Sequence, residues 1–112
     1  MMRYVLTIFV LLIAAGCTGG GDGGGAPSGK QIYDTNCLAC HGAAGKGDGP
    51  AGAALVPPAS DFTDAEWTHG SSLSEIENTI SDGVPDTAMI AWQDLLAASE
   101  IKSVAEYVKS LS

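Results

Sequence analysis

The chain has 112 residues, which is enough for one small domain. It carries 13 acidic residues against 5 Lys plus Arg, for a formal net charge of -8, and its single arginine is Arg3. Because nucleic-acid binding depends on Lys and Arg side chains that neutralise phosphates, this composition excludes a nucleic-acid-binding protein.

The N-terminus indicates export. Arg3 gives a positive start, and the apolar run at 4–15 has the length of a signal-peptide core, whereas a membrane span needs roughly 20 residues. Residues 1–16 are therefore interpreted as a signal peptide. The Ala-Ala-Gly before Cys17 resembles a bacterial lipobox, in which the cysteine is lipidated, although Ala14 stands where leucine is usual. The alternatives are an ordinary signal cleaved near Gly16 and an uncleaved anchor.

Residues 17–28 are interpreted as the lipidated cysteine and a flexible tether. The segment is rich in glycine, which gives a chain that buries no apolar surface and behaves as a flexible coil. A folded domain is then expected over residues 29–112.

The first two predicted helices flank a long irregular stretch. A short helix is expected at about 29–39, with Ile32 and Tyr33 as its apolar members. Residues 42–70 are rich in Gly, Ala and Pro and show no helical or strand period. A second helix is expected to begin at Ser72, where Ser72 and Glu75 match a capping box, and to stop at Gly83. Its buried face would hold Leu73, Ile76 and Ile80.

The last predicted helix has the clearest period. Ser99 is its expected N-cap. Its apolar residues recur at helical spacing and are Ile101, Val104, Ala105, Val108 and Leu111. Since no segment alternates as a strand, the fold class is all-α, with three to four helices and long loops. So small a domain with so long a loop needs a staple, a metal or a cofactor to be stable.

The CxxCH pattern at Cys37–His41 meets that need, because it is an attachment site for one covalent c-type haem. Cys37 and Cys40 would form the two thioethers, and His41 would be the proximal iron ligand. A thioredoxin-like redox pair would need a strand and helix context that is absent here. A zinc site would need a second cysteine pair, which the sequence lacks.

The sixth iron ligand is expected to be Met89. Methionine and histidine are the usual choices, and Met89 is the one methionine outside the signal region. It follows a Gly and Pro stop, in a loop that suits a ligand better than a packing residue. His69, just before the middle helix, is the rival.

From Gly29 to Leu111 the chain resembles a class I bacterial monohaem cytochrome c. Besides Cys37–His41, the matching segments are residues 45–50, 57–62, 83–89 and 100–111. The resemblance implies that the N- and C-terminal helices cross, with Gly29 or Tyr33 meeting Tyr107.

The same resemblance implies that a proline carbonyl accepts a hydrogen bond from the second nitrogen of His41, with Pro50 and Pro57 both candidates. Ile90 departs from the family pattern, because relatives often have proline after the ligand methionine. Trp67 and Trp92 are expected to pack around the haem, with an indole N–H free to reach a propionate.

The expected function is electron transfer without enzymatic turnover, because a His/Met iron has no open position for a substrate. The protein would be a monomer, held by lipid on the periplasmic side of a bacterial membrane, or soluble in the periplasm if the signal is an ordinary one. Its partners would be transient redox proteins with a basic surface, since the chain is acidic; acidity that only maintains solubility is the alternative. Other readings are a haem sensor, in which Met89 leaves the iron, and a haem subunit of a larger oxidoreductase.

Overall fold

The computed structural model describes residues 25–112, so the predicted signal peptide, Cys17 and most of the predicted tether lie outside the described residues. The elements in chain order are α1 (Gly29–Asn36), α2 (Leu38–His41), the 3-10 helix η1 (Gly52–Ala54), α3 (Leu73–Asp82) and α4 (Ala98–Ser110). No strand occurs between residues 25 and 112. The all-α fold class predicted from the sequence is confirmed.

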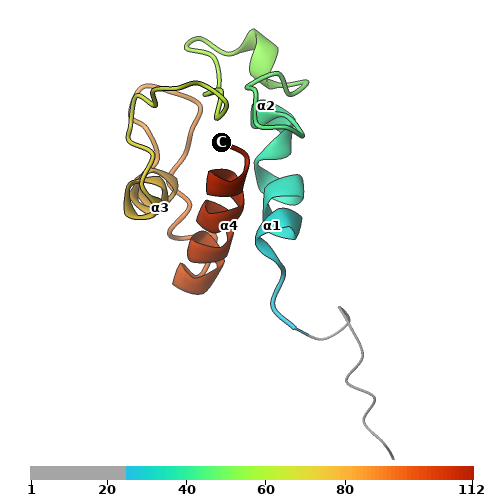
Figure 1. Cartoon of the computed structure of the whole chain (residues 1–112), viewed down its shortest axis with the longest axis vertical. Coiled ribbons are helices and arrows are strands. Elements are labelled where there is room, and N and C mark those ends of the chain that lie inside the picture. The colour runs from blue at the N-terminus through green and yellow to red at the C-terminus, as the bar shows by residue number, and fades with distance from the viewer. Residues whose placement is uncertain (1–24) are drawn as a thin grey trace, which may run out of the picture.

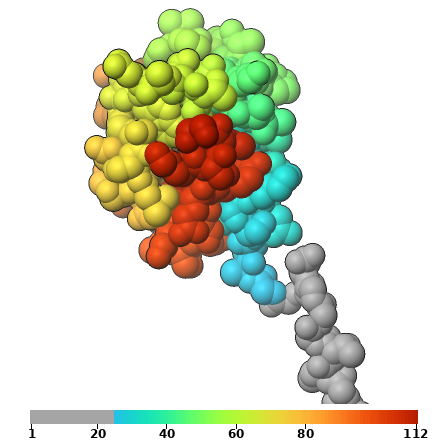
Figure 2. All heavy atoms as spheres, viewed as in Figure 1, coloured from blue at the N-terminus to red at the C-terminus, as the bar shows by residue number. Residues whose placement is uncertain are grey.

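Helix α4 lies between α1 and α3 and packs on both (Figure 1). The irregular segment that follows α2, coloured green to yellow, lies over the ends of these helices next to the C-terminus (Figure 2). Within the described part of the chain, no helix combines the length and the apolar character that crossing a membrane requires.

The crossing of α1 and α4 is close because glycine stands at the contact. A Cβ atom on Gly29 would lie 2.1 Å from the backbone oxygen of Ser103, a distance that no side chain tolerates. One turn further, the rings of Tyr33 and Tyr107 meet with their centroids 5.1 Å apart. The predicted contact between the first and last helices is confirmed.

The core is formed by the apolar faces that the helical periods predict, together with Phe62 of the long loop. Its buried members are Ile32, Tyr33, Phe62, Ile76, Ile80, Ile101, Val104, Ala105 and Val108. Leu73 and Leu111, which were expected on these faces, are partly buried and pack against the core. Burial of such side chains contributes about 1.5–3 kcal/mol each, so this small cluster is the main source of stability that the described residues supply.

The structure corrects two helix boundaries. The first helix does not run unbroken to residue 39 but ends at Asn36 and resumes as α2. The Asn36 side chain donates to the carbonyl of Ile32, which offers the backbone an alternative to the helical ladder.

The second correction concerns the start of α4. Ala97, not Ser99, is the N-cap, and its N–H donates to the Glu100 side chain at 2.9 Å. Because Glu100 satisfies this donor from within the first turn, α4 begins without a capping hydroxyl. The capping box of Ser72 and Glu75 and the stop at Gly83 are as predicted.

Candidate haem site

A cavity of about 370 Å³ lies between the helices and the long loop. Its wall includes all four residues predicted to hold the haem, namely Cys37, Cys40, His41 and Met89. Much of the remaining wall is apolar and comes from every part of the domain: Tyr33, Phe62, Trp67, Ile76, Ile80, Trp92 and Val108. An apolar wall with two thiols, an imidazole and a thioether fits a covalently attached haem.

Cys37 and Cys40 lie one helical turn apart, at the junction of α1 and α2. The N–H of Cys40 donates to the carbonyl of Cys37 at 3.2 Å, and both residues are half-buried free thiols. Burial, with a smaller contribution from the neighbouring Cys40, raises the pKa of the Cys37 thiol to about 11. Residues three apart share one face of a helix turn, and both cysteines line the same cavity, as two thioethers to one ring require.

His41 ends α2, and its ring is fixed from two sides. Its Nδ1 lies 3.3 Å from the carbonyl oxygen of Ser60, and its ring stacks on Phe62 with the centroids 4.7 Å apart. Since a carbonyl only accepts hydrogen bonds, this contact favours the tautomer with hydrogen on Nδ1 and leaves Nε2 with a lone pair for a metal. Burial lowers the pKa of His41, and the bond to Ser60 offsets part of that effect, so the neutral form is favoured.

The prediction of a proline carbonyl for His41 is wrong. The N–H of Phe62 donates to the carbonyl of Gly45 at 2.6 Å, which brings residues 60–62 beside His41. The accepting carbonyl is therefore that of Ser60, and not that of Pro50 or Pro57. Sequence reasoning gave no role to Ser60 or Phe62; an aromatic residue among the small residues of the long loop was the available signal for Phe62.

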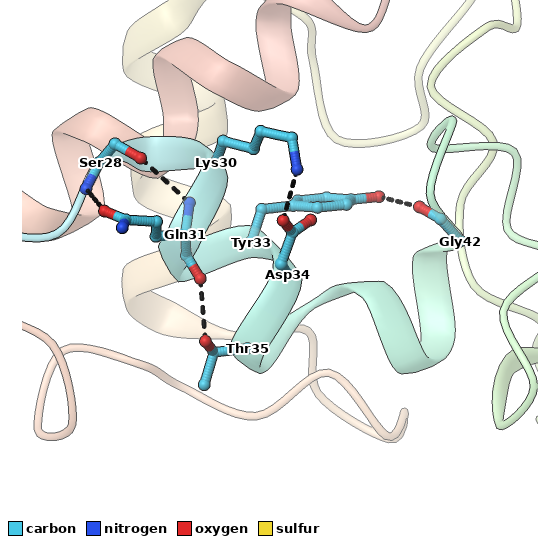
Figure 3. Close-up of polar contacts among 7 residues, drawn as sticks. All are labelled: Ser28, Lys30, Gln31, Tyr33, Asp34, Thr35 and Gly42. Carbon is cyan, nitrogen blue, oxygen red and sulfur yellow. Dashed lines mark hydrogen bonds and ion pairs between the residues drawn. The ribbon is translucent and has the colours of Figure 1, made fainter. Parts of the chain in front are cut away.

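The chain after His41 is held by backbone and side-chain bonds. The buried Tyr33 hydroxyl donates to the carbonyl of Gly42 at 2.6 Å (Figure 3). The N–H of Gly47 donates to the carbonyl of His41 at 2.8 Å. Gly49 packs so closely on α2 that a Cβ atom there would lie 2.4 Å from the carbonyl oxygen of Ala39. These contacts fix the end of α2, and so the place of the imidazole.

Met89 reaches the cavity from the loop between α3 and α4. This loop starts at Gly83, whose φ of 67° belongs to the left-handed region that glycine adopts easily. It returns to α3 through the N–H of Trp92, which donates to the carbonyl of Ile80 at 3.0 Å. Met89 is thus held against the cavity by a loop that is closed on the end of one helix.

The other predicted residues also lie at the cavity. His69 is exposed but borders it, as do Trp67 and Trp92, which pack against the core. The indole N–H of Trp67 donates to the carbonyl of Asp64 at 3.2 Å, so in this structure it is not free for a propionate. For Trp92 the propionate contact stays a prediction.

Comparison with known proteins gives a family match over nearly the whole described region. The family model described as Cytochrome c matches residues 26–112. The Cbb3-type cytochrome c oxidase subunit FixP of Bradyrhizobium diazoefficiens is 41% identical over 77% of this chain and 27% of its own length. Subunit CcoP of an Azospirillum species is 37% identical over 80% of this chain and 30% of its own length. The chain thus spans less than a third of these relatives.

Solved structures show the same fold. The KustC0563 c-type cytochrome superposes with a TM-score of 0.64 and 27% identity, over 77% of this chain and 99% of that one. Cytochrome c6 from the diatom Phaeodactylum tricornutum gives a TM-score of 0.56 and 29% identity, over 73% of this chain and 87% of that one.

Proposed function

Because the chain belongs to the cytochrome c family, we propose that it is an electron carrier that passes single electrons between redox proteins. Family membership confirms the cofactor predicted from Cys37–His41, which is haem c. When bound, this group supplies an iron that changes its charge by one electron. The chain's own residues attach the group, ligate it and exclude water from it.

The proposed ligand set is the one expected from the sequence. Cys37 and Cys40 would hold the group through thioethers, and Nε2 of His41 and the thioether sulfur of Met89 would ligate its iron. The observation that carries this proposal is that the motif at the end of α1 and the loop after α3 line one cavity. The Nδ1 contact with Ser60 supports it further, because it leaves Nε2 free to bind the iron.

With His41 and Met89 both bound to it, the iron would offer no site for a substrate, which supports a carrier without catalytic turnover. Methionine as the second ligand raises the reduction potential. The direct test is a potentiometric titration of the haem-loaded full chain, followed by exposure of the reduced form to carbon monoxide. We expect a reversible one-electron titration and no carbon monoxide adduct. Rapid formation of an adduct by the native protein would favour a gas sensor instead.

The names of the relatives favour a second, narrower candidate function. Both FixP and CcoP are named as subunits of a Cbb3-type cytochrome c oxidase. We propose that this chain delivers electrons to an oxidase of that type, either as a free carrier or as a bound subunit. The reduced protein should then support oxygen consumption by membranes that contain the oxidase. Co-purification with the oxidase would identify a bound subunit, and turnover without co-purification a free carrier.

Charge at the cavity supports a basic partner. The lining includes the carboxylates of Asp61, Asp64 and Glu66, and no lysine of the described region borders the cavity. The hydroxyl and N–H of Thr63 lower the pKa of Asp61, so this carboxyl stays ionised at neutral pH. An acidic rim where the electron leaves would attract a partner with Lys or Arg around its own redox centre.

We also propose the location expected from the N-terminus. Residues 1–16 would be removed as a signal peptide, Cys17 would carry the lipid, and residues 17–28 would tether the domain at 29–112 to the periplasmic side of a membrane. The segment Ala14–Cys17 and the glycine content of the tether support this proposal.

A further inference from the structure

The loop that carries Met89 contains an internal side-chain bridge. The hydroxyl of Thr87 donates to the carbonyl of Val84 at 2.7 Å and accepts from the N–H of Met89 at 3.1 Å. A third bond, from the N–H of Val84 to the carbonyl of Met89 at 2.9 Å, closes the same ring of residues. One hydroxyl thus joins Val84, near the beginning of the loop, to Met89.

The backbone turn in this loop leaves the Val84 carbonyl to bond mainly with the Thr87 hydroxyl. Pro85 and Asp86 are the central residues of a turn, and Asp86 has a φ of 62°, as the third residue of a type II turn does. The turn's own bond, from the N–H of Thr87 to the carbonyl of Val84, is long at 3.3 Å. The shorter bond from the Thr87 hydroxyl is therefore the main contact of the Val84 carbonyl.

The residue directly after Met89 adds little restraint. Ile90 follows it, and the Ile90 side chain is 51% exposed, so it is not anchored in the core. A proline at this position would fix φ, but isoleucine leaves it free. The bond from the Trp92 N–H to Ile80 lies three residues beyond Met89, so the bonds to Met89 itself come from the side that precedes it, where Thr87 lies.

We propose that Thr87 is the positioning residue for Met89, and that its hydroxyl keeps the thioether sulfur at the iron. This inference rests on the proposed ligation by Met89. Because these bonds join Met89 to Thr87 and Val84, Met89 can leave the cavity apart from the rest of its loop only if the ring of bonds around the Thr87 hydroxyl breaks. Loss of the hydroxyl therefore favours the open loop and exposes the iron to external ligands.

Imidazole, which competes with methionine for oxidised haem iron, measures this opening. The experiment compares imidazole affinity in the haem-loaded full chain and in the variants Thr87→Val, Thr87→Ser and Thr35→Val. Serine keeps the hydroxyl and loses only the methyl group. Thr35 is a matched control, because its hydroxyl donates to a helical carbonyl, that of Gln31, on α1 outside the cavity.

Thr87→Val should bind imidazole about tenfold more tightly, which corresponds to about 1.4 kcal/mol, since two hydrogen bonds are lost from the closed state. Thr87→Ser and Thr35→Val should stay within about threefold of the unmodified protein, well short of the tenfold change. The far-red thioether-to-iron band should weaken in Thr87→Val alone.

Two results would overturn the inference without touching the proposed function. One is an imidazole affinity in Thr87→Val equal to that of the unmodified protein, while the thioether-to-iron band is present in both. The other is a change in Thr87→Ser as large as in Thr87→Val, which would assign the effect to the methyl group. Absence of the band from the unmodified protein would instead show that Met89 is not a ligand. Both the proposed ligand set and the role of Thr87 would then be wrong.

Discussion

Two backbone carbonyls fix the surroundings of His41. The carbonyl of Ser60 faces its Nδ1, and the carbonyl of Gly42 accepts the hydroxyl of the buried Tyr33. The first contact sets the tautomer of the ring, and the second holds the chain directly after it. The histidine is thereby oriented by Ser60 and Tyr33, which are distant from it in sequence and cannot be identified from the haem motif.

Substitution of Tyr33 by phenylalanine should lower the free energy of unfolding by about 2 kcal/mol, because the Gly42 carbonyl would lose a buried donor. Tyr107→Phe is the matched control, since Tyr107 lies in the same aromatic pair but its hydroxyl does not make this bond. Its effect should stay within about 0.5 kcal/mol. Denaturant unfolding of the haem-loaded protein measures both, and equal losses would show that the Gly42 bond has no special weight.

At this scale the sequence alone supplies the proposed haem-binding residues but not the groups that support them. Cys37, Cys40 and His41 follow from a local motif of five residues, and Met89 follows from elimination among methionines. The partner of His41 does not, because it depends on how residues 42–62 close back on α2. A loop of glycine, alanine and proline has no period from which that path can be read.

Helix boundaries show which local rules decide the elements. The rule that Ser followed by Glu three residues later caps a helix is correct at Ser72, whereas the rule that serine alone marks an N-cap is wrong at Ser99. In α3 both halves of the box are formed, while α4 uses only the half that Glu100 supplies. Reciprocal caps can thus be predicted from sequence more securely than single ones.

Ser72→Ala should therefore destabilise the domain by about 1 kcal/mol, because the first turn of α3 loses its side-chain acceptor. Ser99→Ala makes the same chemical change inside the first turn of α4 and should alter stability by less than about 0.5 kcal/mol. Thermal unfolding of the two variants side by side measures the difference. A loss in Ser99→Ala as large as that in Ser72→Ala would mean that Ser99 acts as a cap after all.

At the scale of the whole molecule, three acidic residues line the cavity and a segment that resembles a lipobox precedes the domain. Both features were apparent in the sequence as composition, but only the fold brings Asp61, Asp64 and Glu66 to the cavity. The overall fold followed from helix periods and the haem motif, because a small domain with one apolar cofactor has few ways to close. The path of the long loop, by contrast, could not be predicted from these features.

Electron transfer to a partner with a basic surface should slow as ionic strength rises, since salt screens the attraction. The double substitution Asp64→Asn with Glu66→Gln should flatten that dependence. Asp94→Asn with Glu106→Gln removes the same charge away from the cavity lining and should leave most of the slope. Stopped-flow rates at several salt concentrations measure this. If the rate depends on ionic strength equally in the two double variants, the acidity serves solubility rather than docking.

Cys17→Ser should release the protein from the membrane fraction into the soluble periplasm while its haem content stays unchanged. The reason is that the thiol would carry the anchor, whereas the domain at 29–112 folds around the haem. Cell fractionation with mass spectrometry of the N-terminus checks both points. A Cys17→Ser protein that stays in the membrane would favour an uncleaved N-terminal anchor.

The most direct test of a His/Met haem is an optical spectrum of the full chain, oxidised and reduced, after expression with a haem-maturation system. We expect a sharp c-type reduced spectrum and a far-red thioether-to-iron band in the oxidised form. This band should vanish in Met89→Ala and persist in His69→Asn. A band that is absent from the unmodified protein would remove Met89 as the ligand and favour His69 or an open iron, while a chain without covalent haem would overturn the haem site itself.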